Sequence, residues 1–136
     1  MNINLANFYG LLHLKAKETK IGLGVLWHNA GLRTLLSVSL LINVINWGIG
    51  YFVNYRATEE VISLHNNIYF GITLIGAPSQ VYFLPFFGLV VIAVNAFFSY
   101  LIKEDDRFFL YVFSVSSVLV NVFLILGLAA IALLNF

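Results

Sequence analysis

Four asparagines stand inside long runs of apolar residues, where a primary amide is an unusual side chain: Asn43, Asn46, Asn95 and Asn121. Burying an amide in an apolar environment costs several kcal/mol unless the amide is hydrogen-bonded. The asparagines are therefore expected either to bond to groups on neighbouring helices or to line a polar path, such as a pore or a ligand cage. We prefer the first interpretation, in which they are helix-packing contacts.

The spacing of two of these residues narrows the choice of partners. Asn43 and Asn46 are three residues apart, and residues at that spacing share one face of an α-helix. We expect this face to meet Asn95 or Asn121, or the same face in another copy of the chain. Residues 127–132, Gly-Leu-Ala-Ala-Ile-Ala, are predicted to form a small-residue face on which helices approach closely.

Other reactive side chains are sparse. The chain has no cysteine, which excludes disulfides, thiolate metal ligands and cysteine nucleophiles. Its apolar runs hold no histidine or lysine to serve as a base for their serines. The three histidines, His13, His28 and His65, match no metal-binding spacing. The sequence therefore predicts no catalytic residue, no metal site and no cofactor, and we expect the protein not to be an enzyme.

Three apolar runs without a charged residue must position the asparagines: residues 34–54, 81–102 and 108–134. Each is long enough to cross a bilayer, since about 30 Å of hydrocarbon needs roughly 20 helical residues. Only 10% of the chain is charged, against about 25% in a soluble domain. The sequence thus predicts a single all-α integral membrane domain with three transmembrane helices and the lipid bilayer as its direct partner.

The basic residues predict the orientation. One of the seven, Arg56, lies between the first and second runs, and the other six precede the first run or join the second to the third: Lys15, Lys17, Lys20, Arg33, Lys103 and Arg107. The positive-inside rule then places the N-terminus and the turn 103–107 in the cytoplasm, and the loop 55–80 and the C-terminus outside.

The segment before the first run mixes apolar residues with lysines. We expect residues 1–33 to form an amphipathic helix in the cytoplasmic interface, with Lys15, Lys17, Lys20 and Trp27 at the lipid headgroups. Lysines beside a membrane indicate attraction to anionic lipid. Nucleic-acid binding is therefore not predicted.

The outer loop is the unusual part, because residues 61–77 are nearly as apolar as a span yet too short to cross. Their β-branched and aromatic residues favour an extended strand or a short hairpin over the helix ends, with a tight turn of positive φ at Asn66-Asn67. The alternative is a re-entrant dip buried in protein. We prefer the extended form, and expect another chain or the membrane to cover its open edges.

An unusual string runs through this loop into the second run: Leu64-His65-Asn66-Asn67-Ile68-Tyr69-Phe70-Gly71-Ile72, then Leu74-Ile75-Gly76 and Phe83-Leu84-Pro85. It resembles the L-H-Y-N-I-Y-F-G-I-D-type motif of a family of small uncharacterised multi-span membrane proteins from candidate-phyla-radiation bacteria (Patescibacteria). This chain has Asn66 where the family tends to have Tyr, and Thr73 where it tends to have Asp. The resemblance covers residue 64 to the end and implies a membrane location and architecture, with no activity attached.

The motif singles out a set of outer-loop candidates: His65, Asn66, Asn67, Tyr69, Gly71 and Gly76. Together with the intramembrane amides, it predicts a protein that packs against copies of itself or other membrane subunits in a bacterial cytoplasmic membrane. The expected function is that of a structural or assembly subunit. The alternative is a pore or carrier subunit whose asparagines line a polar path, although charge-selective rings are missing from the spans.

Overall fold

The computed structural model describes residues 29–67, 69, 71–102 and 106–136. The predicted interfacial helix up to residue 28, with its lysines, Trp27, His13 and His28, lies outside the described residues. So does most of the turn 103–107.

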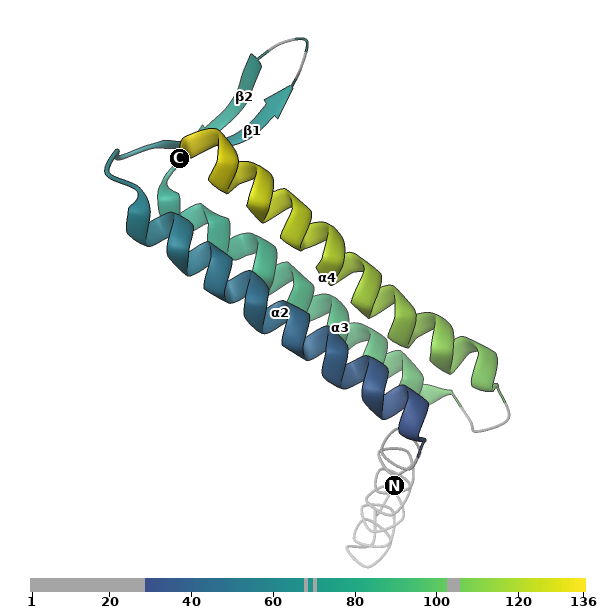
Figure 1. Cartoon of the computed structure of the whole chain (residues 1–136). Helices are drawn as coiled ribbons and strands as arrows, with labels where there is room; N and C mark the ends of the chain where they lie inside the picture. The colour runs from purple at the N-terminus through teal and green to yellow at the C-terminus, as the bar shows by residue number, and fades with distance from the viewer. Residues whose placement is uncertain (1–28, 68, 70, 103–105) are drawn as a thin grey trace, which may run out of the picture.

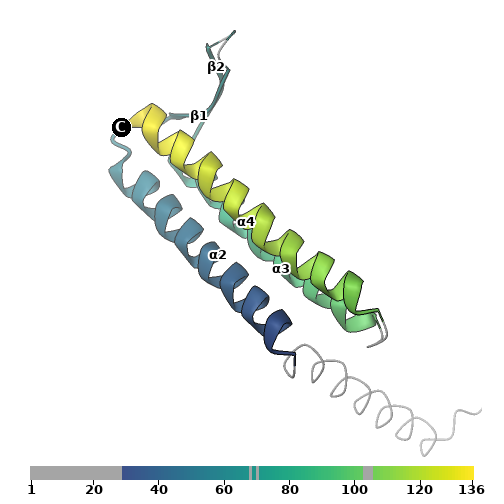
Figure 2. The ribbon, with the colours of Figure 1, turned by 45° about the vertical axis from the view of Figure 1, so that its right-hand side comes forward.

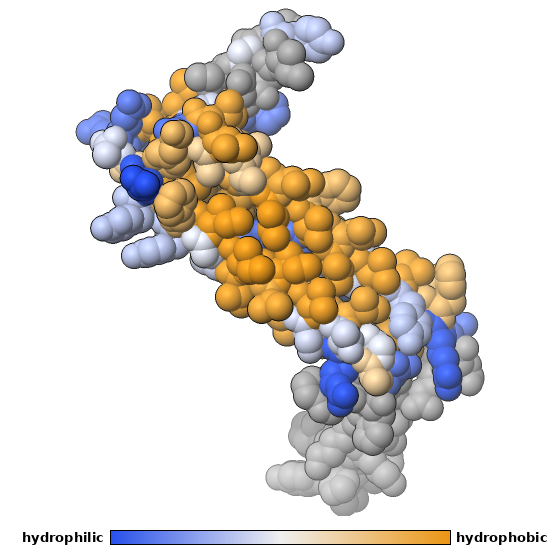
Figure 3. Space-filling view, viewed as in Figure 1, coloured by the Kyte–Doolittle hydropathy of each residue, from blue (hydrophilic) through white to orange (hydrophobic). Residues whose placement is uncertain are grey.

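Three long helices make up most of the described chain and run side by side (Figures 1 and 2): α2 (Ala30–Arg56), α3 (Phe83–Leu101) and α4 (Arg107–Asn135). A short 3-10 helix, η1 (Pro78–Tyr82), leads directly into α3. With η1 counted as part of the second, all three are long and apolar enough to cross a membrane. On the face shown in Figure 3, apolar side chains cover the middle of the bundle, with more hydrophilic side chains at both ends.

The starts of α2 and η1 have a clear origin in the sequence. The side chain of Asn29 accepts hydrogen bonds from the backbone N–H groups of Gly31 and Leu32, at 3.0 and 3.4 Å, and so caps the start of α2. Pro78 stands at the first position of η1, where a missing N–H costs no helical bond. As a result α2 starts earlier than the apolar run 34–54, and the second helical segment starts before residue 81.

The bundle seam follows a repeat of three and four residues. Along α2 the buried positions are Leu32, Ser39, Asn43, Asn46, Gly50 and Val53. Along α3 they are Pro85, Gly88, Ile92 and Ser99. This spacing is that of left-handed helix packing, in which each seam residue inserts between residues of the facing helix.

The outer loop folds as an antiparallel hairpin of β1 (Ile62–Asn67) and β2 (Gly71–Gly76), which projects beyond the end of the bundle (Figure 1). The extended form predicted for this loop is therefore correct. The predicted turn at Asn66-Asn67 is wrong, because both residues belong to β1 and pair with Ile72 and Gly71. The positive φ instead falls on Gly71, at 72°, where the lack of a Cβ removes the steric cost.

The hairpin end of the bundle core is mainly aliphatic. We call its five buried residues the apolar cluster: Val53, Ile62, Val81, Leu128 and Ile131. They come from α2, β1, η1 and α4, so the base of the hairpin packs into the same core as the helix ends.

Candidate functional site

The middle of the bundle core is polar, and its centre is formed by three asparagines that we call the amide cluster: Asn43 and Asn46 of α2, and Asn121 of α4. Each side chain is at most 2% exposed. The α2 face that carries Asn43 and Asn46 thus meets Asn121 within the same chain.

Asn121 is the centre of the hydrogen bonds. Its Oδ1 accepts from the Nδ2 of Asn43 at 3.0 Å and from the Nδ2 of Asn46 at 3.4 Å. Its own Nδ2 donates to the backbone carbonyl of Ser117 at 2.9 Å, and at 3.5 Å to that of Gly88 in α3. One side chain therefore joins all three helices.

The two α2 amides also bond to backbone carbonyls. The Nδ2 of Asn43 donates to the carbonyl oxygen of Pro85 at 2.9 Å, and the Nδ2 of Asn46 to that of Asn121 at 3.1 Å. Two buried oxygens beside this network, Asn46 Oδ1 and Ser39 Oγ, have no hydrogen-bond partner among the described residues. The donors of the cluster are thus engaged within one chain.

Gly88 makes room for the cluster. A Cβ at this position would lie 2.5 Å from Asn121 Oδ1 and 2.7 Å from Asn43 Nδ2, closer than real Cβ contacts allow. Sequence reasoning missed this residue. Its position one turn after Pro85, on the seam that continues to Ile92 and Asn95, is the signal that could have found it.

Asn95 lies apart from the amide cluster. Its Nδ2 donates to the hydroxyl oxygen of Ser117 at 3.0 Å, which joins α3 to α4. The hydroxyl of Ser117 in turn donates to the carbonyl of Phe113 at 3.1 Å.

The small-residue stretch at 127–132 packs differently from the expectation. Its buried side chains are the large ones, Leu128 and Ile131, whereas Ala130 is exposed. A Cβ at Gly127 would make only ordinary contact with Leu84, at 3.6 Å. Of the glycines in α3 and α4, Gly88 is the one at which a side chain would not fit.

A fifth asparagine, outside the predicted spans, fixes the hairpin to the bundle. Asn135, at the end of α4, accepts from the backbone N–H of Ser63 at 2.9 Å and donates to its carbonyl at 2.8 Å. The side-chain amide thus pairs with β1 in the way a neighbouring strand would. Sequence reasoning missed Asn135, because it follows the apolar run 108–134.

The outer-loop motif does not converge on one point. The side chain of His65 is exposed and its backbone pairs with Leu74, whereas Tyr69 lies in the connection between the strands, 88% exposed. Gly76 pairs with Ile62 at the base of the hairpin, where a Cβ would collide with the side chains of Gln80 and Leu64. The motif therefore shapes the hairpin: a glycine at each end of β2 permits a turn and a close contact.

The chemistry that the amide cluster offers is neutral hydrogen bonding. Among the described residues there is no group of three or more His, Cys, Asp or Glu side chains that could hold a metal ion. Comparisons with protein-family models, with curated proteins and with solved structures found no match.

Proposed function

We propose that the chain is a small integral membrane protein that acts as a structural or assembly subunit of a homo-oligomer or of a larger membrane complex. In this proposal the three helices anchor it in a bacterial cytoplasmic membrane, and the hairpin β1–β2 is the surface that other subunits recognise. The observation that carries the proposal is the hairpin, which is fixed to α4 and projects past the bundle (Figure 1).

The hairpin has the properties of a strand-pairing surface. Neither strand contains an acidic residue, a lysine or an arginine, and the aliphatic side chains of Leu74 and Ile75 are 54% and 60% exposed. The edge of β1 is engaged at Ser63 by Asn135. The outer edge of β2 has no neighbouring strand among the described residues. An uncharged open edge is where a strand of another chain adds most readily.

The basic residues support the orientation with the hairpin outside. Arg33 and Arg107 lie in the first turns of α2 and α4, at one end of the bundle, and only Arg56 lies in the helices at the hairpin end. The positive-inside rule then assigns the Arg33 end to the cytoplasm.

The second candidate function is a pore or carrier subunit, with the asparagines lining a polar path. The polar middle of the core favours it. Against it, the cluster amides donate to one another and to the backbone, and the apolar cluster fills the hairpin end of the same core. The assembly proposal uses both features, since an anchor needs a packed core whose amide donors are engaged within its own chain.

Cross-linking tests the assembly surface, and the cysteine-free chain gives it no background. Ile75→Cys places a thiol on β2, and Val44→Cys places a matched thiol on the exposed side of α2. In native membranes, we expect Ile75→Cys to form a disulfide-linked dimer under a mild oxidant or a cross-link to another subunit with a thiol-to-amine reagent, and Val44→Cys to form neither. Equal behaviour of the two variants, together with a monomer without partners in mild detergent, would contradict the proposal.

Thiol labelling tests the orientation separately. Thr58→Cys lies in the loop after α2, and Asp106→Cys lies just before α4 at the other end of the bundle; both positions are exposed. A membrane-impermeant maleimide applied from outside should label the first variant and not the second. The reverse labelling pattern would show that the protein has the opposite orientation in the membrane.

A further inference from the structure

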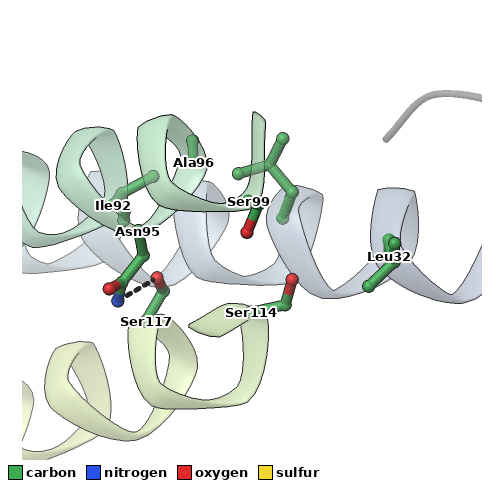
Figure 4. Close-up of a pocket in the computed structure, with 8 residues that line it drawn as sticks. Leu32, Ile92, Asn95, Ala96, Ser99, Ser114 and Ser117 are labelled. Carbon is green, nitrogen blue, oxygen red and sulfur yellow. Dashed lines mark hydrogen bonds between the residues drawn. The ribbon is translucent and has the colours of Figure 1, made fainter. Parts of the chain in front are cut away.

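A second polar region lies between α3 and α4 (Figure 4). Its α4 residues, Ser114 and Ser117, precede Asn121 along α4, so it is nearer to the Arg107 end of the bundle than the amide cluster. It surrounds a small cavity whose oxygen-bearing side chains come from both helices, with leucines of α2 closing one side. The residues are Asn95, Ser99, Ser114 and Ser117, with Leu32 and Leu36.

The size of the cavity limits what can occupy it. It leaves about 10 Å³ for the centre of a water molecule. One ordered water needs roughly 10–15 Å³ by this measure, together with two to four polar partners. An organic ligand is too large.

The hydroxyl groups around the cavity have complementary hydrogen-bond needs. Those of Ser114 and Ser117 donate to carbonyls of their own helix, Leu110 at 2.9 Å and Phe113 at 3.1 Å. Their oxygens therefore offer only lone pairs to the cavity. Ser99 is 5% exposed and lines the cavity, where its hydroxyl group can supply an O–H donor.

The orientation of these groups is visible in the structure. In Figure 4 the hydroxyl oxygens of Ser99 and Ser114 point toward each other from α3 and α4, beside the bond between Asn95 and Ser117. One donor and two acceptors from three serines thus converge on a space of one molecule.

We propose that this cavity is a binding site for a single water molecule, which accepts a hydrogen bond from Ser99 and donates to the oxygens of Ser114 and Ser117. Three hydrogen bonds are the usual number for a buried water. A monovalent cation matches the site less well, because the lining residues carry no negative charge to offset the loss of hydration in a membrane.

The position of the site explains how water reaches it. Ser99 lies in the last turn of α3, so the cavity is close to the aqueous end of the bundle. Beyond the cavity, the backbone carbonyl of Ser117 accepts from Asn121, so the same residue of α4 that lines the cavity also contacts the amide cluster. The proposed water thus lies in the part of the core that also holds the amide cluster, away from the apolar cluster at the hairpin end.

Water-edited solid-state NMR of the full-length protein in liposomes tests the proposal, because it measures magnetisation transfer from water to each side chain. Transfer to Ser99 and Ser114 should build up several-fold faster than transfer to Ser39, a buried hydroxyl on α2 that does not line the cavity. Transfer at Ser99 and Ser114 that is no faster than at Ser39 would overturn the proposal.

A filling variant and a salt titration complete the test. Ser99→Val should displace the water and reduce transfer at Ser114 to the rate at Ser39, whereas Ser37→Val on the exposed side of α2 should leave it unchanged. Unchanged transfer at Ser114 in Ser99→Val would count against the site. Chemical shifts of Ser99 and Ser114 that saturate with sodium or potassium chloride, but not with choline chloride, would assign the cavity to a cation instead.

Discussion

The two halves of the bundle core are built from different side chains. The half next to the hairpin is the apolar cluster, whose contacts are aliphatic, and the rest is an amide cluster followed by a serine-lined cavity. Surrounding lipid is as apolar as leucine, so burial alone does not hold helices together in a membrane. The stability of the hairpin half therefore depends on filled volume, and the stability of the other half depends on the pairing of specific donors with specific acceptors.

The largest effect is expected in the apolar half. Leu128→Ala leaves a cavity next to Val53 and Val81 and should lower the free energy of unfolding by about 2–5 kcal/mol. Leu128→Met, which nearly conserves volume, should cost less than about 1.5 kcal/mol. Both values can be measured by SDS titration in mixed micelles, followed by circular dichroism. Equal losses in the two variants would show that volume is not what matters there.

In the polar half, Asn121→Leu keeps much of the side-chain volume and removes four hydrogen bonds. We expect a loss of about 2–3 kcal/mol in the same titration, since such bonds between membrane helices contribute about 0.6–1.7 kcal/mol each. Asn54 lies on α2 outside the amide cluster, so Asn54→Leu is the control and should change the free energy of unfolding little. An Asn121→Leu variant as stable as the unmodified protein would mean that side-chain shape, and not hydrogen bonding, sets the stability of this half as well.

A smaller loss is expected when a methyl group is added between the helices. Gly88→Ala pushes against Asn121 and Asn43 and should cost about 1–2 kcal/mol of unfolding free energy. Gly48→Ala is a matched control, because a Cβ there meets nothing within 4 Å. If both substitutions behave alike, the close approach at Gly88 is not a constraint.

The smallest effect concerns the hairpin. Asn135→Leu removes both bonds to the backbone of Ser63 and should destabilise the hairpin by about 1 kcal/mol while leaving the helices intact. Hydrogen exchange should then accelerate in β1 and β2 but not in α3. Leu134→Ala, at an exposed neighbouring position, serves as the control. Unchanged hydrogen exchange in Asn135→Leu would show that Asn135 does not fix the hairpin to α4.

The sequence predicted what depends on local pattern, namely three apolar helices and an extended outer segment. It also predicted that Asn43 and Asn46 share a face. It left open which amide that face meets, because the choice of Asn121 depends on contacts across more than seventy positions of the chain. Gly88 and Asn135 were missed because their roles exist only once distant parts of the chain lie together: Gly88 faces Asn43 and Asn121, and Asn135 bonds to Ser63 of β1. The local signals were weak, since Gly88 was marked only by its place on the seam one turn after Pro85, and Asn135 follows the apolar run.

A double-mutant cycle between Asn43 and Asn121 tests most directly that the amide cluster is held within one chain. The unfolding free energies of Asn43→Ala, Asn121→Ala and the double variant would be measured at two protein-to-detergent ratios. The account predicts a coupling energy of about 1 kcal/mol that is the same at both ratios. A coupling near zero, or one that disappears on dilution, would contradict it.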